Sequence, residues 1–279
     1  MDGVYAGAFA GVVTTVTMHP LDLAKVRLQV GRETSLMNVL RDLVSHRWTN
    51  AYRGLTPNLI GNAAAWGAYF GCYEVLQKFA FGSTLQLRET STSHLGCAFT
   101  AGIMSQALTN PIWVLKTRIL GSKPTDKYAS PRLWKNVKAI YARSGVKGFW
   151  RGFWPGTLGT AQSALYFALY APIKPWIRQN IQLPDTATYF VSSTIAKSIA
   201  ATVMYPHQVI RARMQFSEMK LLEAIRDVLL KERWVGFYRG ISANLVRVVP
   251  AMAITIMSYE TARDWLDSRK STTSNIDKN

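Results

Sequence analysis

The chain has 279 residues, of which 48% are hydrophobic and only 18% are charged, whereas soluble proteins average about 25% charged residues. Its 33 Lys and Arg against 16 Asp and Glu give a formal net charge of +17, which suggests nucleic acid, an anionic membrane surface or an anionic substrate as partner. Nucleic acid is disfavoured, because its binders gather cations in exposed patches or tails, whereas here cations recur at the ends of apolar segments.

Several functional classes lack their sequence signatures. Cys72 and Cys97 lie in apolar segments without metal-ligand spacing, so we expect neither a disulfide nor a metal site. No secretory signal begins the chain, and it contains neither a phosphate loop ending in Gly-Lys-Ser/Thr nor a His-Glu-x-x-His motif. The histidines are scattered at segment ends: His19, His46, His94 and His207. We therefore expect a protein that is not an enzyme, with no catalytic residue, bound metal or cofactor.

Six apolar segments are long enough to cross a bilayer, which takes about 20 helical residues. They lie at 3–28, 56–79, 94–120, 153–177, 187–213 and 243–266. The first carries Gly3, Gly7 and Gly11 at four-residue spacing, and small residues so spaced let membrane helices pack closely. The sequence thus predicts an all-α membrane protein with six transmembrane helices.

A short amphipathic stretch separates each odd segment from the even segment that follows it. These stretches, at 35–46, 133–143 and 221–231, mix apolar positions at helical spacing with Lys and Arg, as do helices that lie in a membrane interface. The chain thus divides into three repeats, at 1–86, 87–183 and 184–270. The polar tail, 271–279, is expected to be disordered.

The end of each odd segment carries one sequence frame three times. The frame is a proline, a variable residue two positions later, and cations five and seven positions later. The prolines are Pro20, Pro111 and Pro206, spaced 91 and 95 residues apart. We expect each odd helix to continue past its proline and to kink there, because proline lacks the backbone N–H. Three equivalent kinks predict that the odd helices converge at one end of the bundle.

An aromatic-Arg-Gly triplet follows each amphipathic stretch. The triplets are Tyr52-Arg53-Gly54, Trp150-Arg151-Gly152 and Tyr238-Arg239-Gly240. Together with the proline frame, this pattern resembles the mitochondrial carrier family over essentially the whole chain. A narrower resemblance is to the branch of the family that carries flavin, folate, NAD and pyrimidine nucleotides. It rests on the stretches 62–74, 109–118, 163–170 and 205–215. It also rests on Trp113, a tryptophan at the position two past the proline where the family usually has an acidic residue. The match looks closest to the FAD and folate transporters.

The resemblance implies a location and lipid partners. It implies a monomeric, multi-pass protein of the mitochondrial inner membrane, with the peroxisomal membrane as the alternative. It also implies that the triplets bind cardiolipin, since helix N-termini attract phosphate. The cardiolipin residues would be Arg53, Gly54, Arg151, Gly152, Arg239 and Gly240.

In the family, a ring of ion pairs between the odd helices closes the matrix side. The matching positions here are Asp22, Lys25, Trp113, Lys116, Gln208 and Arg211. Asp22 is placed to pair with Lys116, and Gln208 to hydrogen-bond Lys25. Trp113 offers the remaining cation, Arg211, no carboxylate, only a cation–π contact worth about 0.5–2 kcal/mol. We expect a gate with a single full ion pair; solvated charges at helix ends are the alternative.

A second network, on the even helices, closes the cytoplasmic side in the family. Its matching residues are Glu74, Gln77, Lys174, Glu260 and Arg263. Glu74 can pair with Lys174 and Glu260 can hydrogen-bond Gln77, while the acidic position that would face Arg263 in the family holds Ala171 here. Snorkelling of these side chains to the membrane interface is the alternative.

Substrate contact points in the family lie on the even helices. Eight residues past each triplet arginine, this chain has Gly61, Gly159 and Arg247. The residues that follow them are Asn62, Thr160 and Val248. Arg247 is the sharpest candidate, because an intramembrane charge is costly and a guanidinium binds phosphate or carboxylate bidentately. The glycines leave space for a large planar ring, with helix packing as the alternative. Repeat two is one residue shorter, so Leu158 is the alternative to Gly159.

Further candidates lie near these contact points. Lys197 stands in a small-residue packing slot and is placed to reach a substrate phosphate, with snorkelling as the alternative. Trp66, Tyr69, Tyr166 and Gln162 lie within a few turns of the contact points, where aromatic rings can stack on a flavin, pterin or adenine. Packing against the membrane is the alternative for the aromatics.

We therefore expect a carrier that moves a bulky anionic nucleotide-like cofactor, FAD first, by alternating access. Folate is the next candidate, followed by NAD and pyrimidine nucleotides. A soluble, basic RNA-binding protein is the alternative from a different class, and recovery of native protein without detergent would favour it.

Overall fold

The computed structural model describes residues 2–45, 50–82, 90–122 and 133–276, and helices make up most of each range. The helices of the first repeat are α1 (Asp2–Gln29), α2 (Leu36–Ser45) and α3 (Leu55–Phe81). Those of the second are α4 (Ser91–Gly121), α5 (Leu133–Ser144), the 3-10 helix η2 (Val146–Trp150) and α6 (Phe153–Asn180). Those of the third are α7 (Asp185–Val203), α8 (Tyr205–Ser217), α9 (Leu221–Glu232), η3 (Arg233–Tyr238) and α10 (Ile241–Ile276).

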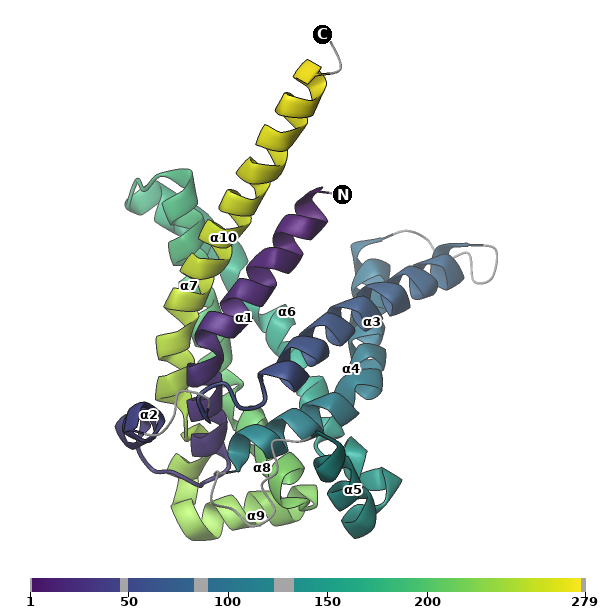
Figure 1. Cartoon of the computed structure of the whole chain (residues 1–279), viewed down its shortest axis with the longest axis vertical. Helices are drawn as coiled ribbons and strands as arrows, with labels where there is room; N and C mark the ends of the chain where they lie inside the picture. The colour runs from purple at the N-terminus through teal and green to yellow at the C-terminus, as the bar shows by residue number, and fades with distance from the viewer. Residues whose placement is uncertain (1, 46–49, 83–89, 123–132, 277–279) are drawn as a thin grey trace.

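The long helices form a closed ring. The first and last helices, α1 and α10, pack along each other, as do α3 with α4 and α6 with α7. Contacts of α4 with α6, of α7 with α10 and of α1 with α4 join these pairs. Both chain termini lie at one end of the bundle, which we call the terminal end, and α2, α5 and α9 lie around the other (Figure 1). That second end carries Pro20, Pro111 and Pro206, and we call it the proline end. The helix pairs diverge toward the terminal end (Figure 1).

Six helical segments of this ring correspond to the predicted membrane-spanning segments: α1, α3, α4, α6, α7 with α8, and α10. By length and composition alone, one stretch of the described residues, Leu221–Arg263, is apolar enough to be picked out as a membrane span. Hydropathy is low elsewhere because the helices mix polar residues with apolar ones; α4, for example, buries Ser105, Thr109 and Asn110. Large apolar side chains such as Phe70, Phe167 and Met257 remain exposed, as a lipid-facing surface requires.

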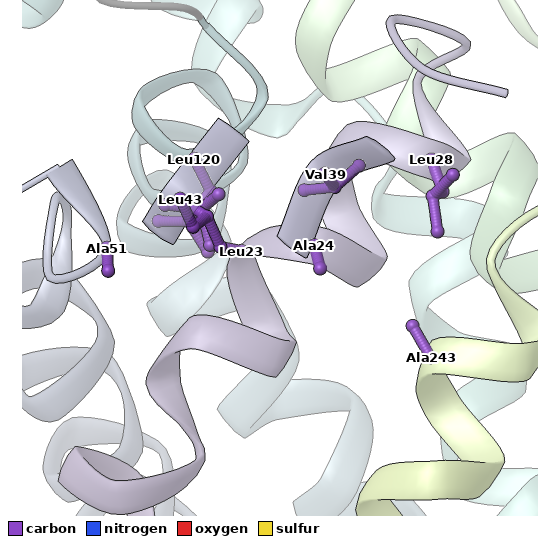
Figure 2. Packing of buried hydrophobic residues seen from close by; sticks show 8 residues of the cluster. All are labelled: Leu23, Ala24, Leu28, Val39, Leu43, Ala51, Leu120 and Ala243. Carbon is purple, nitrogen blue, oxygen red and sulfur yellow. The ribbon is translucent and has the colours of Figure 1, made fainter. Parts of the chain in front are cut away.

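Apolar clusters fasten the short helices to the proline end. Figure 2 shows Val39 and Leu43 of α2 beside Leu23 and Leu28 of α1, in a cluster that also takes in Leu120 of α4. A second cluster joins α8 to α9. Burying one apolar face holds α2 and α9 in place.

The third odd segment differs from the prediction of a continuous kinked helix. The chain stays helical through Pro20 in α1 and Pro111 in α4. In the third repeat the helix breaks at Met204, and Pro206 lies in the first turn of α8. Proline fits there because the first N–H groups of a helix have no intrahelical acceptor.

The predicted disordered tail is wrong for residues 271–276. The last helix, α10, continues to Ile276, and residues 277–279 lie outside the described part of the chain. Once a helix is nucleated, each added residue gains a hydrogen bond at little further cost, so a long preceding helix can carry a polar segment with it.

A left-handed glycine begins each even helix. Gly54, Gly152 and Gly240 have φ values of 80°, 73° and 82°. Any other residue would be strained there by its Cβ. The conserved geometry explains why each triplet ends in glycine.

The side chain of the residue just before each kink proline forms a hydrogen bond with the backbone carbonyl of the triplet arginine. His19 Nε2 lies 3.0 Å from the carbonyl oxygen of Arg53. The equivalent donors are Asn110, 3.2 Å from the Arg151 oxygen, and Tyr205, 3.1 Å from the Arg239 oxygen. Three different side chains thus make an equivalent hydrogen bond in each repeat. This bond connects the odd helix to the start of the even helix in the same repeat.

Candidate functional site

A cavity of about 490 Å³ lies inside the ring, and all six membrane-spanning segments line it. Its walls include four cations, Lys25, Lys116, Arg211 and Arg247. Among the described lining residues, Asp22 is the single carboxylate. Because opposite charges recognise each other best at such a site, the cavity suits an anion with more than one negative charge.

Arg247 and Asp22 form an ion pair in this cavity. The distance between Arg247 Nη1 and Asp22 Oδ1 is 2.9 Å, and the Asn58 amide donates to the other carboxylate oxygen at 3.4 Å. The predicted partner of Asp22, Lys116, instead lies with its Nζ 4.9 Å from the ring centroid of Trp113. The guanidinium of α10 reaches across to α1, which spacing along the chain does not reveal.

The predicted bond between Lys25 and Gln208 is formed. Lys25 Nζ donates to Gln208 Oε1 at 2.9 Å and also to Asn244 Oδ1 at 2.8 Å. Gln208 in turn donates to Gln162 at 2.9 Å. This chain of bonds connects α10, α1, α8 and α6 toward the proline end of the cavity. Its function as a gate remains a prediction.

The predicted contact between Trp113 and Arg211 is wrong in this conformation. The Trp113 ring faces Gly61 and Lys116, and its indole N–H donates to Thr109 at 3.2 Å. Within the described part of the chain, the Arg211 side chain makes no hydrogen bond or ion pair. Arg211 therefore presents an uncompensated charge to the cavity.

Of the six contact-point residues, Arg247 and Gly159 line the cavity. A Cβ at Gly159 would meet nothing within 4 Å, so the glycine leaves open space there. The alternative, Leu158, is exposed and is absent from the cavity wall. Gly61 leaves no space for a ring, because a Cβ there would come within 3.2 Å of Ile112 and 3.4 Å of Trp113. It permits close packing of α3 on α4.

The remaining contact-point residues pack between helices. Asn62 donates to Thr15 at 3.3 Å. The Thr160 methyl group lies against α4, where a Cβ on Gly102 would come within 3.0 Å of it. Val248 is buried. None of the three lines the described cavity wall.

Some of the predicted aromatic, glutamine and lysine candidates line the cavity and others lie outside its described wall. Trp66, Tyr69 and Gln162 line the cavity, and the first two rings meet edge to face at 6.3 Å. Tyr166 is outside the described wall and stacks on Tyr170 of its own helix at 5.9 Å. Lys197 is outside the described wall, and its Nζ lies 3.8 Å from the sulfur of Met252.

At the terminal end, the predicted pairs between even helices are not formed. Glu74 pairs with Lys78 on its own helix at 2.7 Å. Lys174 lies 3.7 Å from the ring centroid of Tyr189, and Gln77 donates to Tyr73 at 3.1 Å. The helix pairs diverge at this end (Figure 1).

A second cavity, of about 630 Å³, lies at the terminal end between α1 and α10. Glu260 and Arg263 line it, together with Tyr259. Two residues of the predicted cytoplasmic network thus face an open space in this conformation.

The sequence interpretation missed the role of the second cation in each proline frame. All three form ion pairs around the central cavity, at the proline end. The pairs are Arg27 with Asp42 at 2.9 Å, Arg118 with Glu218, and Arg213 with Asp227 at 3.1 Å and Glu232 at 2.6 Å. Their recurrence seven residues past each proline was the available signal. The Arg118 pair links repeat two to repeat three.

Comparisons with known proteins agree with this geometry. The sequence model of the mitochondrial carrier protein family matches residues 1–84, 88–180 and 183–270. The chain is 34% identical to "Mitochondrial FAD carrier protein FLX1" of Saccharomyces cerevisiae, over 92% of this chain and 94% of that protein. It is 33% identical to "Mitochondrial nicotinamide adenine dinucleotide transporter 1" of the same yeast, over 94% and 76%. It is 32% identical to the chloroplastic "Nicotinamide adenine dinucleotide transporter 1" of Arabidopsis thaliana, over 94% and 90%.

Proposed function

Because this chain belongs to the mitochondrial carrier family, whose members are transporters and not enzymes, we propose that it carries FAD across the mitochondrial inner membrane by alternating access. The substrate binds in the central cavity between the two ends of the bundle. The observation that carries the proposal is the charge of that cavity, four cations against one carboxylate among its described lining residues.

The cavity also supplies surfaces for the rings of FAD. Trp66 and Tyr69 form an aromatic wall, and Gly159 leaves open space on α6. Aromatic side chains gain about 0.5–1.5 kcal/mol by stacking or edge contacts with another ring. We assign the pyrophosphate of FAD to the cations near Arg247 and one of its ring systems to the wall at Trp66.

NAD is the second candidate, because relatives named as NAD transporters match the chain nearly as well as the FAD carrier does. Both dinucleotides contain adenine and a pyrophosphate. The nicotinamide ring of NAD is cationic and offsets part of that charge, whereas the flavin ring is neutral. A cavity with excess positive charge therefore favours FAD. Folate, with carboxylates in place of phosphates, and pyrimidine nucleotides, with a smaller ring, come next.

The orientation in the membrane is part of the proposal. The proline end faces the matrix and carries the matrix gate, formed in this conformation through Lys25 and Gln208. The terminal end faces the cytoplasm, where Glu74, Lys174 and Glu260 belong to the gate that closes in the opposite state. The protein is a monomer. Cardiolipin binds it at the N-termini of α3, α6 and α10, next to Gly54, Gly152 and Gly240.

Thermal stabilisation of the purified protein tests the choice of substrate. A ligand that binds the folded protein raises its unfolding temperature in proportion to the logarithm of its concentration over Kd. We expect the largest rise with FAD, then smaller ones with NAD, FMN, folate and UTP at equal concentrations. A rise with UTP and none with FAD would contradict the proposal.

A further inference from the structure

Two amide side chains in the wall of the central cavity each have one polar atom without a partner. They are Gln106 of α4 and Gln162 of α6, both of which are half-buried. An amide has an acceptor oxygen and a donor nitrogen, and a partner on one of them decides which of the two remains available. The atom that each amide offers to the cavity therefore follows from its bonds.

The partners of Gln106 leave its oxygen available. The Asn110 amide nitrogen donates to the Phe149 carbonyl at 2.8 Å and to the Arg151 carbonyl at 3.2 Å. The oxygen of Asn110 is thus turned toward Gln106, whose Nε2 donates to it at 2.9 Å. Within the described part of the chain, Gln106 Oε1 has no hydrogen-bond partner. Gln106 therefore offers an acceptor to the cavity.

The partners of Gln162 leave its nitrogen available. An ammonium group can only donate, and Lys25 Nζ donates to Gln208 Oε1 at 2.9 Å. The nitrogen of Gln208 is thus turned toward Gln162, whose Oε1 accepts from it at 2.9 Å. Among the described residues, Gln162 Nε2 has no acceptor. Gln162 therefore offers a donor to the cavity.

The two amides lie next to the aromatic wall of the cavity. The Ser105 hydroxyl of α4 donates to the Ala65 carbonyl of α3 at 2.9 Å. The residues that follow these two, Gln106 and Trp66, therefore lie at the same level, and both line the cavity. On its other side Gln106 approaches α6, because a Cβ on Gly156 would lie 3.1 Å from its Nε2. A planar ring on the aromatic wall would thus present its edge to α4 and α6.

We propose that these two amides form a subsite for the edge of a nitrogen heterocycle. Gln106 accepts from a ring N–H or an amino group, and Gln162 donates to a ring carbonyl or a ring nitrogen. This inference rests on the proposed function only in that the substrate carries such a ring. The flavin edge, an N–H between two carbonyls, and the adenine edge, an amino group beside a ring nitrogen, both have this chemistry. The two amides determine specificity, since a ring without these groups would leave them unpaired.

Paired analogues of FAD test the subsite and identify the ring that binds there. One analogue is methylated at the flavin N–H and the other is dimethylated at the adenine amino group, so each lacks the donor of one ring. Their Kd values are measured by calorimetry on purified full-length wild type and on Gln106→Met, which has a side chain of similar length without an amide. We expect one analogue to bind wild type about tenfold more weakly than FAD, and Gln106→Met to bind FAD and that analogue equally weakly. The analogue that shows this coupling identifies the ring.

The other outcomes overturn the inference. If both analogues bind wild type as tightly as FAD does, neither ring donates a hydrogen bond in the cavity. If Gln106→Met weakens FAD and both analogues by the same factor, the amide only supports the wall. Ser105→Ala is the matched control, because Ser105 also lines the cavity from α4 but its hydroxyl already donates to Ala65. It is expected to change the Kd of FAD less than about twofold.

Loss of folding by Gln106→Met would not leave the inference untested. The comparison of FAD with its analogues on wild type needs no variant. Gln162→Met removes the donor on the other helix and is expected to weaken FAD binding about tenfold. Unchanged binding by this variant would contradict the subsite.

The choice of FAD is tested separately. A protein that does not bind FAD, but shows the same coupling of Gln106 with NAD and with NAD dimethylated at its adenine amino group, would retain the subsite and lose the FAD proposal. A protein that binds FAD without the coupling would do the reverse.

Discussion

The two ends of the bundle are joined in different ways. At the proline end, polar bonds cross between repeats: Lys25 to Gln208, Thr117 to Gln215 at 2.7 Å, and Arg118 to Glu218. At the terminal end the helix pairs diverge (Figure 1), the ion pair of Glu74 stays within one helix, and the bonds of Gln77 to His94 and Arg178 to Asp185 join helices that follow each other in the chain. A carrier that alternates between two open states needs this difference, because gates at both ends must not be closed firmly at the same time.

The cations of the proline frames also divide into those that stabilise the fold and those that face the substrate cavity. The second cations of the proline frames pair with carboxylates around the cavity, whereas Arg211 and Lys116 face the cavity without a carboxylate among the described residues. Positions two residues apart on one helix therefore serve two functions. The predictions below test this division.

The largest effect is expected from Arg247→Ala. Without the guanidinium, the cavity loses its main anion contact, and FAD uptake into liposomes is expected to fall to the level of protein-free vesicles. The unfolding temperature is expected to change little, because Lys25 and Lys116 remain close to Asp22. Arg178→Ala, at an exposed site near Asp185, is the control. Near-normal uptake by Arg247→Ala would remove this residue from the site.

The link between repeats at the proline end is expected to matter for stability. Glu218→Gln breaks its pair with Arg118 in a mostly buried setting, and removal of one partner of such a pair costs about 3 kcal/mol or more. Thermal unfolding in detergent measures the effect. Glu74→Gln breaks an exposed pair at the terminal end and is expected to leave the unfolding temperature unchanged. Equal losses from both variants would contradict the difference between the ends.

A smaller loss of stability is expected from Gly54→Ala. A Cβ at this position would meet a left-handed φ of 80° and would clash with a Leu120 methyl carbon. Strain of this kind costs about 1–3 kcal/mol. Gly67→Ala, at a helical position of α3 with nothing within 4 Å of the Cβ, is the control and is expected to be neutral or slightly stabilising. The two unfolding temperatures give the comparison, and similar values for both variants would show that the turn tolerates a side chain.

An effect of similar size is expected from Asn110→Ala, which removes the bond to the Arg151 carbonyl together with the bonds to Phe149 and Gln106. We expect a loss of about 1–3 kcal/mol, because buried partners are left unsatisfied, with FAD affinity changed less than about twofold because the side chain is outside the described cavity wall. A changed affinity at unchanged stability would place Asn110 in the substrate site.

The repeats could be predicted because their signals are local. A proline followed by cations at fixed spacing marks an odd helix wherever it occurs, and amphipathic stretches between helices mark the surface helices. The break at Met204 escaped prediction because Pro206 can either kink a continuous helix or start a new one, and packing decides which. Among the described residues, hydropathy alone selects only Leu221–Arg263, so the repeat carried more information than composition.

The site could be predicted only in part, because partner choice depends on how each helix is rotated. The bond of Lys25 to Gln208 followed from the threefold frame. The pairing of Asp22 with Arg247 did not, since no local pattern connects residues so far apart in the chain. The bonds made by His19, Asn110 and Tyr205 were hidden by their different chemistry, although all three precede a kink proline.

Uptake of radiolabelled FAD by liposomes that contain the purified protein tests the central claim most directly. The account predicts saturable FAD uptake that exceeds uptake of NAD and UTP and is lost in Arg247→Ala. Absence of FAD uptake above protein-free liposomes, with NAD or UTP accumulating in the same vesicles, would contradict it.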